Sequence, residues 1–548
     1  YWIINKNKFT NILDRMIGNI TLTYKPIEGL TITNNAGTDF YTEGRRKVYA
    51  KGTVGALNGK FQTWNLYKRI INNDLMVSYE KTFANDYHFK VMMGHNLYQE
   101  EWKNENVQAQ NLVVDGLYTY TNAKSTTPVN YYEKKRLVGL YGDISLGYKD
   151  MLFINVTGRN DWDSKLAFSK QKSFFYPSVG LSALLSEMVK LPEVISYAKI
   201  RGSYTVVASS FDRFLTNPGY EYNSQTHNWA NPTVYPMDNM KPEKTKSWEI
   251  GLNLKFWGNR FNLDATYYRS NTLNQTFKVD IPSSSGYKQA IVQAGNVQNQ
   301  GIELALGFSD KWAGFGWSSN ATFTLNRNKV KRLASGSVNP VTGEAIQMDE
   351  MNVGWLGKEN VAPRVILTEG GSMTDIYVYN QLTKDNNGNI KVDQNGNLGI
   401  TSSNTPVKVG NLDADFNLGW TNHFTYKGID LGVVLSARVG GLAYSATQGI
   451  LDYYGVSETS ATARDNGGIP INNGKVNAQK YYQTIGTGEG GYGRYYLYSA
   501  TNVRLQELSL NYTLPKRWFK NVANVTLGIV GRNLWMIYCK APFDPELS

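Results

Sequence analysis

The sequence has 548 residues, a formal net charge of +12 and a single cysteine, Cys539. Its mean hydropathy is −0.41. One cysteine excludes an intrachain disulfide and with it the disulfide-rich secreted class. The lysines and arginines are spread along the chain, which argues against nucleic-acid binding. The positive charge then fits solvated loops and polar faces, or contact with anionic lipid headgroups or an anionic ligand.

Composition favours an all-β chain. Aromatic residues make up 13% of the sequence and glycine contributes 51 residues, a content typical of strands joined by many turns. No run of about 18 apolar residues occurs, so a membrane-spanning helix is not expected. The first residues are not a signal peptide, and the chain stops abruptly at Ser548. We interpret it as a fragment of a longer mature protein.

Segments that alternate apolar and polar residues begin near the N-terminus and recur in pairs joined by short turns. Such alternation puts apolar side chains on one face of a strand and polar side chains on the other. A long polar segment at 99–136 and a loop at 161–172 interrupt the pairs, and 186–195 is predicted to hold one or two helical turns. The strands predicted in this part are 16–25, 30–40, 48–55, 61–70, 75–79, 87–93, 138–148, 152–156, 175–185 and 198–206.

The clearest hairpin runs from Trp248 to Arg269. Apolar residues occupy alternate positions on both sides of the turn Trp257-Gly258-Asn259-Arg260. Each arm has about 9–11 residues, the length that a tilted strand needs to cross a bilayer. One such hairpin would also fit the edge of a soluble sandwich, so the interpretation depends on how often the pattern recurs.

The pattern recurs to the end of the chain, giving about eighteen strands in which short turns alternate strictly with long loops. Outer-membrane barrels have short periplasmic turns and long extracellular loops, and closure pairs every backbone group in lipid. We therefore predict a transmembrane antiparallel β-barrel, with Trp257, Trp317, Trp518 and Trp535 suited to interfacial girdles. The later strands are 302–308, 319–325, 416–426, 431–437, 503–513 and 525–535, and the later loops 208–243, 271–298, 326–413 and 440–499.

Several blocks resemble the starch-utilisation-type SusC/RagA family of TonB-dependent outer-membrane transporters, in the order in which that family has them. The resemblance implies that residues 1–548 are part of a barrel of about 22 strands. It also implies a plug domain and a TonB box upstream of Tyr1 and a final strand beyond Ser548. The blocks are GRNDWDSKL (from Gly158), FFYPSVGLSALLSE (from Phe174), KIRGSYT (from Lys199), KPEKTKSWEIGL (from Lys241), TYYRSNTLNQ (from Thr266), GNVQNQGIELAL (from Gly295), VGNLDADFNLGWTNHFTYKGIDLGVVLSARVGG (from Val409), SATNVRLQELSLNYTLP (from Ser499) and VGRNLWMIYCKAPFDPE (from Val530).

The resemblance further implies a function and partners. Family members import oligosaccharides, and some import peptides, with force supplied by TonB and the inner-membrane proton gradient. They pair with a SusD-like surface lipoprotein lid, usually as a dimer of two barrel–lid pairs. We therefore expect a glycan importer in the outer membrane, in contact with lipid and lipopolysaccharide. Peptide import, a passive porin or adhesin barrel, and a soluble lectin or hydrolase are the alternatives.

Asp161, Trp162 and Asp163 are the first candidates for ligand binding, because they follow a predicted strand at its outer end. An aromatic ring can stack on the apolar face of a sugar while carboxylates accept hydrogen bonds from its hydroxyls. A structural loop corner is the alternative interpretation.

Aromatic and basic residues of the long loops are the second group of candidates. Such side chains could contact the ligand or form the interface with the lid. The candidates are Trp229, Tyr453, Tyr454, Tyr492 and Arg494.

No constellation of residues predicts catalysis, a cofactor or a metal. The four histidines are far apart in the sequence, and His423 lies on the polar face of a predicted strand. The loop Asp385 to Leu398 superficially copies the start of a calcium loop, but Ile390 stands where such a loop requires glycine and no glutamate closes it. The pairs Asn387-Gly388 and Asn395-Gly396 favour hairpin turns instead.

Overall fold

The structure, a computed structural model, describes residues 2–546 except 218, 224–225, 238–239, 335–337, 340, 342 and 347. Tyr1 and Ser548, on which the interpretation as a fragment rests, lie outside the described residues.

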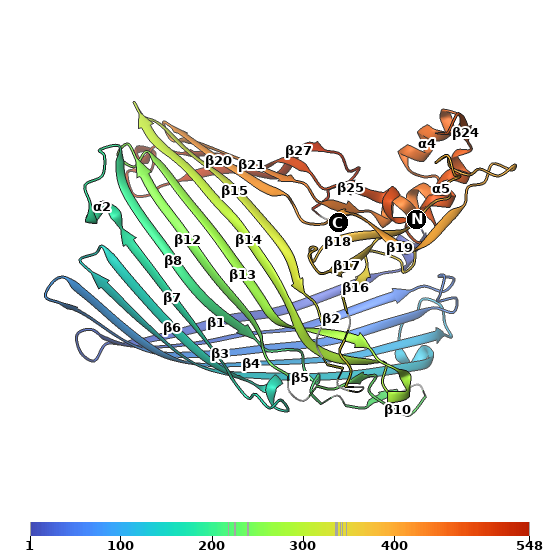
Figure 1. The fold of residues 1–548 in the computed structure, drawn as a ribbon, viewed down its shortest axis with the longest axis horizontal. Coiled ribbons are helices and arrows are strands. Elements are labelled where there is room, and N and C mark those ends of the chain that lie inside the picture. The colour runs from blue at the N-terminus through green and yellow to red at the C-terminus, as the bar shows by residue number, and fades with distance from the viewer. Residues whose placement is uncertain are drawn as a thin grey trace.

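A 17-stranded sheet dominates the fold, and its long strands pair in chain order as an antiparallel meander. The sheet has sixteen long strands besides β11, two fewer than the eighteen strands predicted from alternation. The predicted strands 30–40 and 48–55 correspond to β2 followed by a turn, and 61–70 and 75–79 both belong to β3. Figure 1 shows the sheet curling from the blue β1–β4 through the green β8, β12 and β13 to the orange and red β20, β21 and β27. Short β11 (Val234–Tyr235) pairs in parallel with β14. The long strands are β1 (Phe9–Tyr24), β2 (Leu30–Tyr49), β3 (Lys60–Phe83), β4 (Tyr87–Leu112), β5 (Ala123–Tyr148), β6 (Leu152–Asp163), β7 (Phe174–Leu184), β8 (Ile195–Ser209), β12 (Glu243–Phe256), β13 (Phe261–Asp280), β14 (Gln289–Trp312), β15 (Phe315–Arg332), β20 (Phe416–Tyr426), β21 (Ile429–Val439), β26 (Asn502–Thr513) and β27 (Thr526–Cys539).

The outer face of the sheet is apolar, as the alternation predicts. In the hairpin of β12 and β13, Ile250 lies opposite Tyr267, and the row continues to Ile302 on β14. These side chains are left exposed: Ile250 is 54% exposed, and Leu306 on β14 is 57% exposed. A contiguous apolar surface of this extent, arranged in rows across many strands, fits hydrocarbon rather than water.

The inner face is polar and holds its own ion pairs. Arg201 on β8 lies 2.9 Å from Asp264 on β13, and Asn253 donates a hydrogen bond of 3.0 Å to the same carboxylate. The charges on this face therefore contact one another and line the interior of the wall.

Short turns gather at one end of the sheet and long insertions at the other, as Figure 1 shows for the left and right ends of the view. The hairpin of β12 and β13 turns at the predicted residues, between Phe256 and Phe261. Trp257, Gly258 and Asn259 have φ values of 48°, 66° and 68°, and positive φ is what tight hairpin turns require. By analogy with outer-membrane barrels, the short turns are the periplasmic end.

Two segments that the sequence analysis treated as loops are largely strand, and those predictions were wrong. β4 and β5 continue through most of 99–136, as far as the pair Leu112 and Ala123. β13 and β14 continue through most of 271–298. Beyond the bilayer both faces of a strand meet water. The alternation of apolar and polar residues then disappears, although the backbone hydrogen bonds continue.

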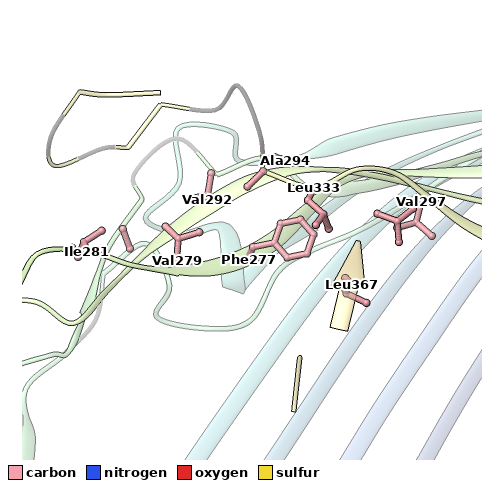
Figure 2. Packing of buried hydrophobic residues seen from close by; sticks show 11 residues of the cluster. Phe277, Val279, Ile281, Val292, Ala294, Val297, Leu333 and Leu367 are labelled. Carbon is pink, nitrogen blue, oxygen red and sulfur yellow. The ribbon is translucent and has the colours of Figure 1, made fainter. Parts of the chain in front are cut away.

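The insertions at the long-loop end have structure of their own. The segment between β15 and β20 contains a four-stranded sheet, where an irregular stretch was predicted. In a hydrophobic cluster, β17 of this sheet packs against β13–β15. Figure 2 shows three of its residues, Phe277 on β13, Val292 on β14 and Leu367 on β17. The smaller strands are β9 (Glu221–Asn223), β10 (Asn228–Ala230), β16 (Glu350–Trp355), β17 (Arg364–Thr368), β18 (Asp375–Leu382), β19 (Ile400–Asn411), β22 (Leu442–Tyr444), β23 (Ile469–Ile471), β24 (Gly474–Val476) and β25 (Leu497–Ser499).

The helices are short. The single turn of α2 lies within the predicted 186–195 region, apart from its first residue. None of the helices in the described residues is both long and apolar enough to cross a membrane. They are α1 (Trp2–Lys6), α2 (Leu185–Met188), α3 (Ala446–Tyr453), α4 (Glu458–Asp465) and α5 (Ala478–Gly486), with 3-10 turns η1 (Tyr120–Asn122), η2 (Ser164–Leu166), η3 (Ser283–Ser285), η4 (Gly493–Tyr496) and η5 (Lys516–Phe519).

Candidate ligand-binding site

The insertion between β21 and β26 folds into three short helices, α3, α4 and α5. Ser445, Ser457 and Asn477 are their N-caps, and each cap side chain accepts a hydrogen bond from the backbone N–H three residues later. Such caps satisfy N–H groups that a helix start leaves unpaired. They stabilise helices of only eight or nine residues.

Asp452 fixes the packing between these helices. Its side chain is buried, and it accepts hydrogen bonds from Gln448 Nε2 at 2.9 Å and Thr459 Oγ1 at 3.0 Å, together with one from Ser457 Oγ. A buried carboxylate with several donors is stabilised in place. Asp452 therefore shapes the site by holding the end of α3 against the start of α4.

A cavity of about 430 Å³ opens beside Asp452, a size within the range of small-molecule sites. The predicted residues Tyr453 and Tyr454 line it, with their rings edge to face and the ring centroids 5.0 Å apart. Arg464 closes one side and donates a hydrogen bond of 2.6 Å to the carbonyl of Gly455. The remaining lining residues, which the sequence analysis missed, are Ser460, Ala478, Gln479, Tyr482 and Gln483, besides Asp452.

Burial raises the pKa of several tyrosines in the insertion, of which only Tyr482 lines the cavity. It raises the pKa of Tyr481 to about 12, and it does the same for Tyr444 and Tyr498. Burial, and then the negative charge of Asp452, raise the pKa of Tyr482. A phenol is protonated at neutral pH with or without this shift. The cavity itself therefore offers the rings of Tyr453, Tyr454 and Tyr482, neutral donors and the Arg464 guanidinium.

The other predicted loop residues do not line this cavity. Trp229 lies on the β9–β10 hairpin, where its 67% exposed ring packs against Tyr222 with the centroids 5.1 Å apart. Tyr492 precedes η4, and its N–H donates to the carbonyl of Ile485 at 2.8 Å. Arg494, within η4, is exposed. The candidates are thus distributed over two separate insertions.

Asp161, Trp162 and Asp163 do not line one site, because they lie on a strand. β6 runs to Asp163, so its alternation places Trp162 on the outer face and both aspartates on the inner face. Asp161 accepts hydrogen bonds from Arg159 Nε at 2.8 Å and Tyr176 Oη at 2.5 Å. Asp163 is the N-cap of η2 and accepts a hydrogen bond from Ser210 Oγ at 2.5 Å. One sugar could therefore not contact the Trp162 ring and the two carboxylates at the same time.

The loop 385–398 forms two tight turns of the same design. Asp385 accepts hydrogen bonds from the backbone N–H groups of Asn387 and Asn389 at 2.8 and 2.9 Å. Asp393 accepts the corresponding hydrogen bonds from Asn395 and Asn397. These bonds agree with the hairpin interpretation of the Asn-Gly pairs. Within the described part of the chain, no group of three or more His, Cys, Asp or Glu residues is placed to hold a metal ion.

Acid is expected to loosen these turns. The backbone N–H donors of Asn389 and Asn397 hold the pKa of Asp385 and Asp393 below the ordinary value of 3.8. The resulting stabilisation is present above the unfolded-state pKa and is lost as the pH falls through the lower folded-state pKa. Hydrogen–deuterium exchange of residues 383–399, corrected for intrinsic rate, should show steady protection down to mildly acidic pH and a loss at lower pH.

Asp385→Ala should expose only the first turn at neutral pH, leaving the Asp393 turn as an internal control. A calcium chelator should change neither turn. A loss of protection on chelation at neutral pH would show that a bound cation, rather than backbone donors, holds the carboxylates.

Comparison with known proteins identifies the family. Residues 4–534 match the family described as TonB dependent receptor-like, beta-barrel. The chain is 24% identical to TonB-dependent receptor P3 of Formosa agariphila, over 98% of this chain and 55% of that protein. It is also 24% identical to TonB-dependent receptor SusC of Bacteroides thetaiotaomicron, over 99% of this chain and 54% of that protein. The chain therefore spans about half the length of these curated relatives.

A solved structure shares the fold over the whole chain. The RagAB peptide transporter matches with a TM-score of 0.78 and 16% identity, covering 100% of this chain and 60% of that one. The meander, its two faces and its two unlike ends agree with this match. The chain belongs to the β-barrel family of TonB-dependent receptors, is of the SusC/RagA type, and is an outer-membrane protein.

Proposed function

We propose that this chain supplies the wall and extracellular loops of an energised importer of oligosaccharides. The cavity of α3–α5 carries the proposal. Its tyrosine rings can stack on the apolar faces of sugars, while Gln479, Gln483 and Arg464 can hydrogen-bond to hydroxyl groups. The cavity lies in an insertion at the long-loop end, which in an outer-membrane barrel faces the medium.

In this proposal the barrel performs no covalent step. A SusD-like lipoprotein lid captures the glycan outside, and the loops and inner wall receive it. TonB then pulls on a plug domain of the whole protein, and this opens a path to the periplasm. TonB would supply the energy for this step. Two barrel–lid pairs would assemble as a dimer.

Peptide import is the second candidate. The RagAB protein, which shares this fold, is described as a peptide transporter. Amide and guanidinium groups such as those of Gln479 and Arg464 also bind peptide carbonyls and carboxylates. A passive porin or adhesin is a weaker candidate, because the family is one of TonB-dependent receptors.

Tyr454→Ala should weaken ligand binding without unfolding the protein. The ring is 65% exposed, so its loss removes little packing, whereas losing an aromatic contact with the ligand should weaken binding about tenfold. Isothermal titration of the full-length receptor with its lid, using separate oligosaccharide and peptide pools, measures the effect. Phe168→Ala is the matched control, because this loop ring is 61% exposed and does not line the cavity.

The two ligand pools separate the candidates. If oligosaccharides bind and Tyr454→Ala weakens their binding, glycan import is supported. If only peptides bind and Tyr454→Ala weakens their binding, peptide import is supported instead. Equal binding by Tyr454→Ala and Phe168→Ala would remove the cavity from the proposal. Trp229→Ala, tested in parallel, reports on the β9–β10 hairpin separately.

A further inference from the structure

Basic side chains gather on the outer face of β3, β4 and β5, directly beyond the apolar rows. The register places Asn73, Leu97 and Val138 in one row of this face. The next three rows towards the long-loop end contain four cations. We name Arg69, Lys103, Lys134 and Arg136 the outer basic cluster.

The outer basic cluster contains more positive than negative charge. Glu101 is its one carboxylate among the described residues of these three rows, and it lies 2.7 Å from Arg69 and 3.4 Å from Lys103. Arg136 donates a hydrogen bond of 3.0 Å to Gln99, which is uncharged. Lys134 lies in the same row as Glu101. One carboxylate therefore faces four cations.

The cluster remains accessible from the lipid side. The side chains of Arg69 and Lys103 are 40% and 52% exposed, and Arg136 is exposed. The Lys103 ammonium also lies 5.6 and 5.7 Å from the ring centroids of Tyr67 and Tyr132. Aromatic rings beside cations are typical of the headgroup level of a membrane protein.

Position on the wall indicates the depth of the cluster. Trp162 lies opposite Val138 on the same outer face and is 40% exposed, which suits an interfacial ring at the end of the apolar rows. The cluster begins one row further out, at Arg136. The long-loop end faces the medium, so this level is the headgroup region of the outer leaflet.

We infer that the outer basic cluster binds the phosphate groups of anionic lipid in the outer leaflet, as lipopolysaccharide carries. Charge complementarity and continuity with the apolar rows favour a lipid over a soluble ion. A phosphorylated lipid would place its acyl chains on Leu97 and Val138 and its phosphates on the cations above them. The inner-face lysine Lys68, in contrast, pairs with Glu100 at 2.7 Å.

Reconstitution of the full-length receptor into phosphatidylcholine nanodiscs with bisphosphorylated lipid A tests this inference. The double variant Lys134→Gln, Arg136→Gln should bind lipid A about tenfold more weakly by native mass spectrometry, because each cation near a charged surface contributes severalfold. Among the described residues neither side chain forms an ion pair, so folding should survive. Glu101→Gln should instead tighten binding severalfold, an effect that a merely structural contact would not give.

Lys81→Gln is the matched control, because Lys81 lies on the same face beside Phe83 near the short turns. It should leave lipid A binding unchanged. Dephosphorylated lipid A should bind the wild-type and double-variant proteins equally weakly. The inference is overturned if the double variant retains lipid A like the wild type, or if it loses phosphorylated and dephosphorylated lipid A alike. Displacement of lipid A by inorganic phosphate alone would indicate a soluble-anion site and also overturn it.

Discussion

Leu306→Arg is expected to remove most of the folded receptor from the outer membrane. Leu306 lies on the outer face of β14, between Leu263 on β13 and Ala321 on β15, and it is 57% exposed. Its neighbours along the strand on the same face are Leu304 and Phe308. An arginine on the lipid face near the bilayer midplane costs about 2–4 kcal/mol, a large part of a typical folding free energy of about 5–15 kcal/mol.

Thr324→Arg is the control for this substitution. Thr324 lies on the inner face of β15 opposite Glu303, where a new guanidinium gains a carboxylate partner and contacts no lipid. The folded fraction in outer-membrane preparations, measured as the fast-migrating band on an unheated gel, should fall for Leu306→Arg and stay near wild type for Thr324→Arg. Equal losses would contradict the assignment of the two faces.

The membrane-embedded hairpins could be predicted because one face of each strand meets lipid and the other a polar interior. Because of this contrast, apolar and polar residues alternate along each strand. For the hairpin of β12 and β13, the sequence predicted the turn residues correctly. The alternation ends where the lipid ends. Residues 99–136 were therefore predicted as a polar segment, although the pairing of β4 with β5 continues through most of them.

Structure within the insertions could be predicted less well, because their cores form between segments far apart in sequence. The cluster in Figure 2 joins Phe277 on β13 to Leu367 on β17, and no local pattern indicates such a contact. The helix caps were a usable signal: Ser445, Ser457 and Asn477 each begin a helix. Reading them as caps would have predicted α3–α5.

The candidate site was found only in part for the same reasons. Tyr453 and Tyr454 were recognisable as loop aromatics and do line a cavity, whereas Gln479 and Tyr482 come from α5 and needed the helix packing to be known. The prediction for Asp161–Asp163 overlooked a rule that was available. A strand that continues to Asp163 must point Trp162 away from both carboxylates.

Gly301→Ala is expected to destabilise the barrel by about 1–3 kcal/mol, the range for overpacking. A Cβ at Gly301 would lie 2.2 Å from the carbonyl oxygen of Leu325 and 2.6 Å from the Tyr268 hydroxyl. That hydroxyl donates a hydrogen bond of 3.1 Å to Asn326 on β15. The Tyr268 ring therefore extends from β13 over Gly301 on β14. Backbone on one side and an anchored ring on the other leave the methyl group no room.

Gly180→Ala is the matched control, because Gly180 also lies in a long strand but has open space within 4 Å of its Cβ position. The midpoint of thermal unfolding of the detergent-solubilised full-length receptor should fall for Gly301→Ala and stay level or rise slightly for Gly180→Ala. Adding Tyr268→Ala to Gly301→Ala should recover only part of the loss, since the Leu325 carbonyl remains in place. Full recovery would show that the ring alone sets the requirement for glycine, and equal midpoints for the two single variants would show that the strands separate freely at this position.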